Sequence, residues 1–203
     1  MLFTISFLIL VKSGHLRTSV IESLAARFRA KWVFDYSHPS IPEITTDASL
    51  AHHGLLSSVT AMFLRDVDLA SVPAEHLASL AACVTADVVI WNISNTDLTS
   101  ILDSSKCGGL YIRNQSLSTK ETLALVRAME NMEMVALGEY MEEVTLDISS
   151  LVTYDGRGKC ENVRFWNNAA ERYREQVRRW AQRISWKVTC DNSNVIIIRG
   201  FMN

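Results

Sequence analysis

Apolar residues recur at regular intervals along the chain from about residue 55 onward. Several short segments begin with an apolar residue and then alternate apolar and polar positions, as a half-buried strand does. The steps between segment starts are 26, 22, 25 and 28 residues, and the starts are Met62, Val88, Leu110, Val135 and Val163. The same lead-in, Lys-Cys, precedes the segments at Leu110 and Val163. This periodicity predicts strands that are structural counterparts of one another.

Three stretches near these segments have the spacing of amphipathic helices. One begins near Pro73, which suits a first helical position, and another at the capping-box pair Ser118 and Glu121. Asn168 and Glu171 repeat the capping-box spacing and predict the third helix. The apolar positions that we expect to face inward are Leu77, Leu80, Ala81 and Val84; Thr122, Leu125, Val126 and Met129; and Tyr173, Val177, Trp180, Ala181 and Ile184.

Strands at equivalent phase, joined mostly by helices, predict a parallel α/β sheet. The connections 99–104 and 147–153 are too short for more than a turn or two. The pattern resembles the leucine-rich repeat, L-x-x-L-x-L-x-x-N/C-x-L over 20–29 residues, with Val, Ile, Met or Phe often replacing Leu. Residues 117–129 are similar to the helical half of its ribonuclease-inhibitor-like subclass, and the resemblance covers about residues 55–188. It implies an α/β solenoid with a parallel sheet on one face and helices on the other; the alternative is a plain α/β domain.

The first part of the chain predicts a separate β-α segment. Residues 1–11 are almost wholly apolar, and no Lys or Arg precedes them as in a signal peptide, so we favour a buried strand. Ile21, Leu24, Ala25, Phe28 and Trp32 then fall on one helical face. The expected organisation is a tail of a preceding repeat module (1–37), a linker (38–49) and a leucine-rich-repeat-like domain (50–203). The pattern of residues 21–28 recurs 156 positions later, at residues 177–184, which suggests that the chain belongs to a longer array.

The compartment predicted from the sequence is the cytoplasm. Four Cys in 203 residues are too sparse for a disulfide framework. The alternative is secretion, with residues 1–11 as a signal peptide. The sequons at Asn92 and Asn114 support that alternative, although both fall on expected strands.

Composition and charge narrow the classes of partner. Hydrophobic residues make up 48% of the chain and charged residues 21%, which excludes an intrinsically disordered chain. The net charge of −2 gives no reason to expect nucleic acid or an anionic membrane. The apolar runs are shorter than a bilayer-spanning helix requires, so we expect no membrane partner. Arginines concentrate on the helix near residues 168–184, and we interpret them as a solvated outer face: Arg172, Arg174, Arg178, Arg179 and Arg183.

We find no catalytic, metal or cofactor motif in the sequence. The five His lack the i, i+4 spacing of a helical zinc pair, and Cys-x-x-Cys is absent. Residues 156–160 (GRGKC) are glycine-rich and basic but lack the phosphate-loop frame. We therefore expect buried structural thiols at Cys83, Cys107, Cys160 and Cys190, and no enzyme. The alternative is a small α/β enzyme with a site at the carboxyl ends of the strands, built from residues such as His76, Asp97 or Cys107.

Residues between the inward strand positions supply the candidate binding surface. In a solenoid of this kind they project from the concave sheet face, and Trp, Tyr and Arg dominate binding hot spots. The expected partner-binding residues are Phe63, Arg65, Val89, Trp91, Tyr111, Arg113, Arg164 and Trp166. The sequence thus predicts a non-catalytic module that binds a protein partner and needs no small-molecule cofactor. The family resemblance implies a recognition part of a larger protein, such as an innate-immune receptor, although no nucleotide-binding motif is present.

Overall fold

The computed structural model describes residues 9–10, 32–36, 59–65, 78, 81–82, 84–94, 97–138, 143–190 and 194–198. In the first three strands only the backbone is described, apart from the side chains of Met62 and Leu64. The five His and Cys83 lie outside the described residues. The predictions made for them therefore stay predictions.

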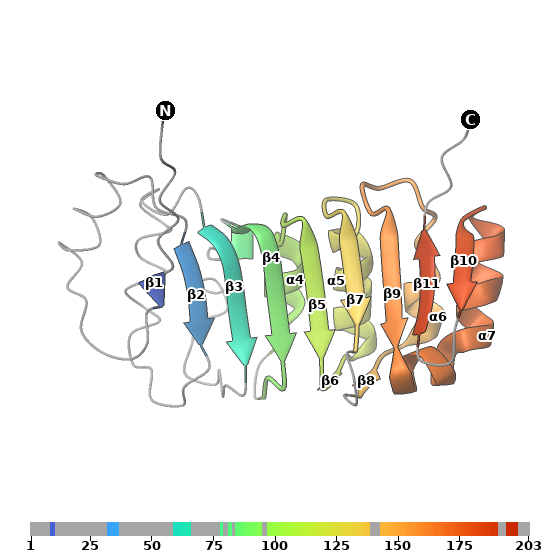
Figure 1. Cartoon of the computed structure of the whole chain (residues 1–203), viewed down its shortest axis with the longest axis horizontal. Coiled ribbons are helices and arrows are strands. Elements are labelled where there is room, and N and C mark those ends of the chain that lie inside the picture. Colours follow the sequence, from blue (N-terminus) through green and yellow to red (C-terminus); the bar gives the residue numbers. More distant parts are fainter. Residues whose placement is uncertain are drawn as a thin grey trace.

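The described part of the chain is an α/β structure built on one open, mostly parallel sheet (Figure 1). The strand order is β1-β2-β3-β4-β5-β7-β9-β11-β10, parallel from β1 through β9, and β11 is antiparallel to both of its neighbours. The strands are β1 (Ile9–Leu10), β2 (Trp32–Tyr36), β3 (Val59–Arg65), β4 (Val84–Trp91), β5 (Gly109–Arg113), β7 (Met134–Leu137), β9 (Asn162–Trp166), β10 (Lys187–Cys190) and β11 (Asn194–Ile198). A small parallel pair, β6 (Gln115–Ser116) and β8 (Val144–Thr145), lies apart from this sheet.

The labelled helices cover the same face of the sheet (Figure 1). They are α4 (Thr99–Ser104), α5 (Thr119–Ala128), α6 (Ile148–Leu151) and α7 (Asn167–Arg183). The shortness expected of the connections at 99–104 and 147–153 is confirmed by α4 and α6. None of the helices in the described residues combines the length and apolar character that crossing a bilayer would require.

The five aligned segment starts are backbone partners across the sheet. Met62 pairs with Val88, Val88 with Leu110, and the same line continues through Val135 to Val163. The residues two positions later form a second line. Both lines point toward the helices and are fully buried: Met62, Leu64, Val88, Ile90, Leu110, Ile112, Val135, Leu137, Val163 and Phe165. The sequence-derived register is therefore confirmed in the described strands.

The chain leaves several strands through a left-handed residue. Asn92, Asn114 and Asn167 follow β4, β5 and β9 with φ of 50°, 43° and 44°, and Gly138 follows β7 with φ of 79°. Asn and Gly are the residues that tolerate this backbone region best. The turn sends the chain off the sheet directly after each of these four strands. In three of the segments Asn stands at the fifth position, counted from the segment starts Val88, Leu110 and Val163; in the segment that starts at Val135, Gly138 stands at the fourth.

Side chains of later repeats satisfy the backbone of earlier ones. Gln115 accepts from the Ile93 amide at 2.9 Å and donates to its carbonyl at 3.1 Å. The Tyr173 hydroxyl does the same for Leu146, at 3.0 and 3.1 Å. These turns have few sheet partners, so the side chains replace the hydrogen bonds that a neighbouring strand would provide.

Helix α5 ties two neighbouring turns together. Ser118 and Glu121 form the predicted capping box, since each accepts from the other's backbone amide. The same Glu121 carboxylate accepts from the buried amide of Leu98, at 2.9 Å, just before α4. Asp103 on α4 receives two hydrogen bonds from Arg127 on α5, at 2.9 and 3.0 Å. The capping box is confirmed, and its acid has a second role that spans two repeats.

Several sequence predictions are wrong in detail. Trp32 begins β2 instead of lying on a helical face, and Val84 begins β4 instead of ending a helix. Helix α7 begins at Asn167 without a side-chain cap, so Asn168 and Glu171 form no capping box. The sheet is not wholly parallel, because the final hairpin reverses direction. The inward stripe of α7 is otherwise confirmed by the burial of Tyr173, Val177, Trp180 and Ala181.

The sheet is continuous across the expected linker. Strand β2 lies in the segment 1–37 and pairs with β3, which belongs to 50–203. Strand β1, within the apolar run 1–11, pairs with β2 in parallel. The described strands on both sides of 38–49 thus share one sheet, while residues 38–49 themselves lie outside the described part.

Candidate partner-binding face

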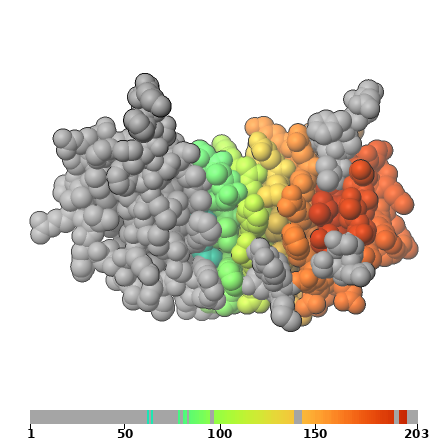
Figure 2. Space-filling view, in the orientation of Figure 1, coloured from blue at the N-terminus to red at the C-terminus, as the bar shows by residue number. Residues whose placement is uncertain are grey.

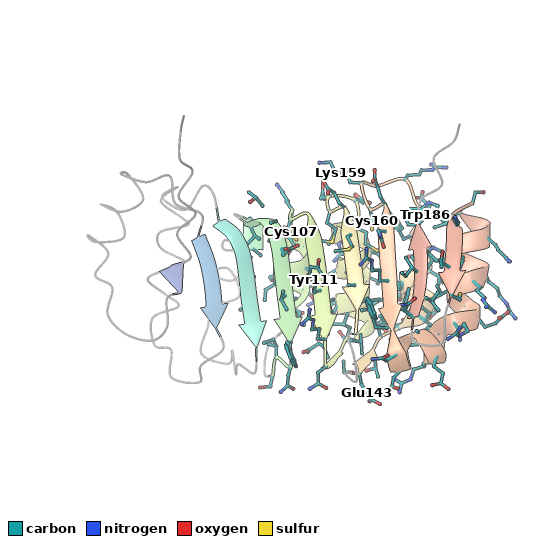
Figure 3. The ribbon with its side chains drawn as sticks, in the orientation of Figure 1. Cys107, Tyr111, Glu143, Lys159, Cys160 and Trp186 are labelled. Carbon is teal, nitrogen blue, oxygen red and sulfur yellow. The ribbon has the colours of Figure 1, made fainter. Side chains whose placement is uncertain are left out.

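The face of the sheet opposite the helices carries the predicted binding residues. We call it the open face; in the described strands β4 to β10 it is visible in the space-filling view (Figure 2). Tyr111 lies near its middle (Figure 3). Register and alternation assign to it Asp87, Val89, Trp91, Gly109, Tyr111, Arg113, Met134, Ala136, Asn162, Arg164, Trp166, Lys187, Thr189, Asn194 and Ile196.

An arginine between two aromatic rings forms the centre of this face. The Arg113 guanidinium lies 5.6 Å from the centroid of the Trp91 ring and 5.9 Å from that of Tyr111. Trp91 and Arg113 are register partners, and all three side chains are half-buried. Cation–π attraction favours this arrangement and restricts the motion of the long Arg side chain. The structure thus brings together three of the predicted residues.

Arg164 and Trp166 form a second group on β9. Both are half-buried, and the Arg164 Nε donates to the Asn162 side chain at 3.3 Å. Arg164 shares a line across the sheet with Tyr111, and only Ala136 lies between them. Ala136 is 4% exposed, so larger neighbouring side chains close over it. The two groups therefore belong to one packed surface.

The side chains of the described binding residues are less exposed than they would be on a fully solvated surface. Val89 is only 6% exposed and can support a contact surface but offers little contact area of its own. This corrects its place among the binding residues. Phe63 and Arg65 pair in register with Val89 and Trp91, which puts them at open-face positions, but their side chains lie outside the described residues.

Asp87 is an open-face residue that the sequence search missed. Partial burial raises its pKa above the usual value for Asp. A β-carbon on its register partner Gly109 would lie 2.6 Å from the Asp87 Oδ1, so the glycine leaves space for this carboxylate. Alternation along the strand could have identified Asp87 from the sequence, because it stands two residues before Val89 and therefore lies on the same face.

Cys107 and Cys160 occupy equivalent places at the amino edge of the sheet (Figure 3). Both are buried, and each thiol approaches the carbonyl two residues on, at 3.1 Å for Cys107 and 3.5 Å for Cys160. Burial is the main cause that raises the pKa of Cys107 to about 11. The expected structural role of these two thiols agrees with this environment. The glycine-rich residues 156–160 pack against the turn at Met129 and Glu130.

We expect Cys107 and Cys160 to resist alkylation in the folded protein. At pH 8 a thiol with a pKa of about 11 is almost wholly protonated, and the thiolate is the reactive form. Cys190 is half-buried and should react faster than either. Peptide mass spectrometry after timed iodoacetamide treatment measures this order, with guanidinium-unfolded protein as the control. Equal native rates for Cys107 and Cys190 would contradict the burial.

Two residues of the alternative enzyme site, Asp97 and Cys107, do not come together, and the third, His76, lies outside the described residues. Asp97 follows the carboxyl end of β4, whereas Cys107 precedes the amino end of β5, and these parallel strands put them at opposite edges of the sheet. Hydrogen bonds from Lys120, at 2.5 Å, and from Thr99 lower the pKa of Asp97 to about 2. This exposed ion pair connects Lys120 on α5 to Asp97 just before α4, and so joins two neighbouring segments of the chain. The described residues contain no group of three or more potential metal ligands.

Two other sequence features have clear positions. Asn92 and Asn114 are exposed and lie just after the strands, which corrects their expected place on them. The α7 arginines face away from the core; Arg179 pairs with Glu175 at 3.2 Å, one turn away. This agrees with a solvated outer helix face.

Comparisons with known proteins identify no family for this chain. No family model matches the chain, and a search of curated proteins finds no match. Among solved structures, the chain is similar to the crystal structure of archaeal TYW1, at 12% sequence identity over 93% of this chain and 73% of that chain. The TM-score is 0.36, so we draw no functional argument from this likeness.

Proposed function

We propose that this chain is a non-catalytic protein-interaction module with a leucine-rich-repeat-like solenoid architecture, and that it binds its partner through the open face. The observation that carries the proposal is the group Trp91, Tyr111 and Arg113, held together on the side of the sheet opposite the described helices. Trp, Tyr and Arg dominate the energetics of protein interfaces. Half-buried side chains of this kind lose little entropy when a partner covers them.

The order of the strands supports the solenoid. From β1 to β9 each strand of the main sheet lies beside its predecessor in that sheet, as stacked repeats require. The shared register and the repeated left-handed turn support it further. The short helices α4 and α6 and the reversed hairpin depart from a regular leucine-rich repeat. A receptor role rests on the family resemblance alone, and a cytoplasmic location rests on the small number of cysteines; both remain part of this proposal.

Replacing the open-face tryptophans should weaken partner binding. We expect Trp91→Ala and Trp166→Ala each to cost more than about 2 kcal/mol of binding free energy if they are hot spots. The full-length chain serves as bait to capture the partner. Titration calorimetry then measures the affinity of that partner for the wild-type chain and for each variant. Leu123→Ala removes an exposed apolar residue from α5, on the other side of the sheet, and should leave binding unchanged. Unaltered binding together with a lower unfolding free energy would assign the tryptophans to the core instead.

A further inference from the structure

Three cationic side chains lie on one diagonal of the open face. They are Arg113 on β5, Arg164 on β9 and Lys187 on β10. From Arg113 to Arg164 the register moves two strands across and two residues toward the amino edge, and the step to Lys187 repeats it. With strands about 4.8 Å apart and about 3.3 Å per residue along them, each step spans about 12 Å.

Negative charge is scarce on the same surface. Among the described open-face side chains Asp87 is the one carboxylate, and it lies on β4 at the amino edge, off the diagonal. The described open face is therefore positive, although the whole chain carries a net charge of −2. A local field of this sign favours a partner of the opposite sign.

Two of the cations are held in place before any partner arrives. Arg113 lies against the rings of Trp91 and Tyr111, and Arg164 donates to Asn162. A positioned guanidinium can form two parallel hydrogen bonds to a carboxylate and loses less side-chain freedom in doing so. The neighbouring rings offer apolar area to aliphatic or aromatic residues beside that carboxylate.

We infer that the open face recognises an acidic peptide segment whose carboxylates recur at about 12 Å and are separated by apolar residues. This deepens the proposed function and rests on it. The spacing corresponds to about four residues of extended chain or about eight residues of helix. Arg113 and Arg164 bind the carboxylates, Lys187 adds long-range attraction at one end, and Trp91 and Trp166 pack on apolar residues beside those carboxylates.

A displayed library of random 16-residue peptides, selected on the immobilised full-length chain, tests this inference. We expect the enriched peptides to carry repeated Asp or Glu together with Trp, Phe or Leu. For a synthetic copy of an enriched peptide, Arg113→Gln and Arg164→Gln should each raise Kd about fivefold or more, and Lys187→Gln about threefold. Raising NaCl tenfold should weaken binding. Arg178→Gln removes the same charge from the exposed face of α7 and should leave Kd unchanged within about twofold.

The outcomes separate this inference from the proposed function. Enrichment of neutral or basic peptides that still need Trp91 would overturn the acidic partner and leave the open face as the binding surface. Peptides that bind equally to the wild-type chain and to the Trp91→Ala and Arg113→Gln variants would overturn both. A selection without enrichment also counts against the inference. Thermal unfolding of each variant confirms that lost binding is not lost folding.

Discussion

Trp180→Ala should cost about 3–5 kcal/mol of unfolding free energy, the range typical of a buried Trp replaced by Ala. Trp180 is 2% exposed and lies on the inward face of α7. Its Nε1 donates to the Tyr154 carbonyl at 2.8 Å, and its ring meets that of Tyr154 edge-on with centroids 6.5 Å apart. The substitution leaves a cavity and an unpaired buried carbonyl, and it loosens the helix that packs on the last strands.

Guanidinium unfolding followed by far-ultraviolet circular dichroism measures this loss. Trp180→Phe keeps most of the ring volume but not the donor, so it should cost distinctly less than the Ala variant. Arg178→Gln, on the exposed face of the same helix, should change the free energy of unfolding by less than about 0.5 kcal/mol. A loss below about 1 kcal/mol for Trp180→Ala would show that α7 is not anchored through this ring.

Gly158→Ala should destabilise the protein by about 3 kcal/mol, at the upper end of the overpacking range. An added β-carbon would lie 2.5 Å from the Glu130 Cα, 2.7 Å from the Tyr154 hydroxyl and 2.9 Å from the Met129 carbonyl. Two of these neighbours are backbone atoms, which cannot rotate away. The loop must then move, and that movement weakens the hydrogen bonds from Lys159 and Cys160 to the turn of the preceding repeat, now 3.0 and 3.1 Å long.

Gly108→Ala is the matched control, because this glycine lies in the corresponding loop before β5. Its added β-carbon would approach the Ala86 carbonyl at 3.2 Å, which a shift of a few tenths of an ångström relieves. We expect a loss of about 1 kcal/mol or less there, measured by the same unfolding experiment. Equal losses at the two positions would mean that removal of glycine flexibility, not the close approach at Gly158, sets the cost.

The repeat register was predictable from sequence because burial acts on it directly. A shift of one residue would turn every inward side chain of a strand to the other face, so the apolar pattern must keep phase from strand to strand. Aligning Met62, Val88, Leu110, Val135 and Val163 therefore predicted their pairing. The same alternation placed Trp91, Tyr111 and Arg113 on the open face.

Other features depend on contacts that periodicity does not encode. Trp32 and Val84 fit both a helical stripe and a strand, and only pairing with neighbouring strands decides between them. The reversal at β11 follows from a short connection to β10, and an apolar run such as 195–198 looks the same in either direction. The partial burial of the open-face side chains depends on how the larger ones pack around Ala136, and no single sequence position reveals that packing.

Among the described residues, the side chain–backbone hydrogen bonds that join neighbouring segments run mostly in one direction. Gln115, Tyr173 and Trp180 each serve the backbone of an earlier repeat. A weaker bond of 3.4 Å runs the other way, from the Asp147 amide to the Thr122 hydroxyl. Removing a later segment thus leaves backbone polar groups of the preceding segment without their hydrogen-bond partners. Removing an earlier segment only exposes to water the side chains that had bonded to it. The coupling has a polarity: damage introduced near the carboxyl end of the described sheet should spread to the strands before it, and damage near the amino end should stay local.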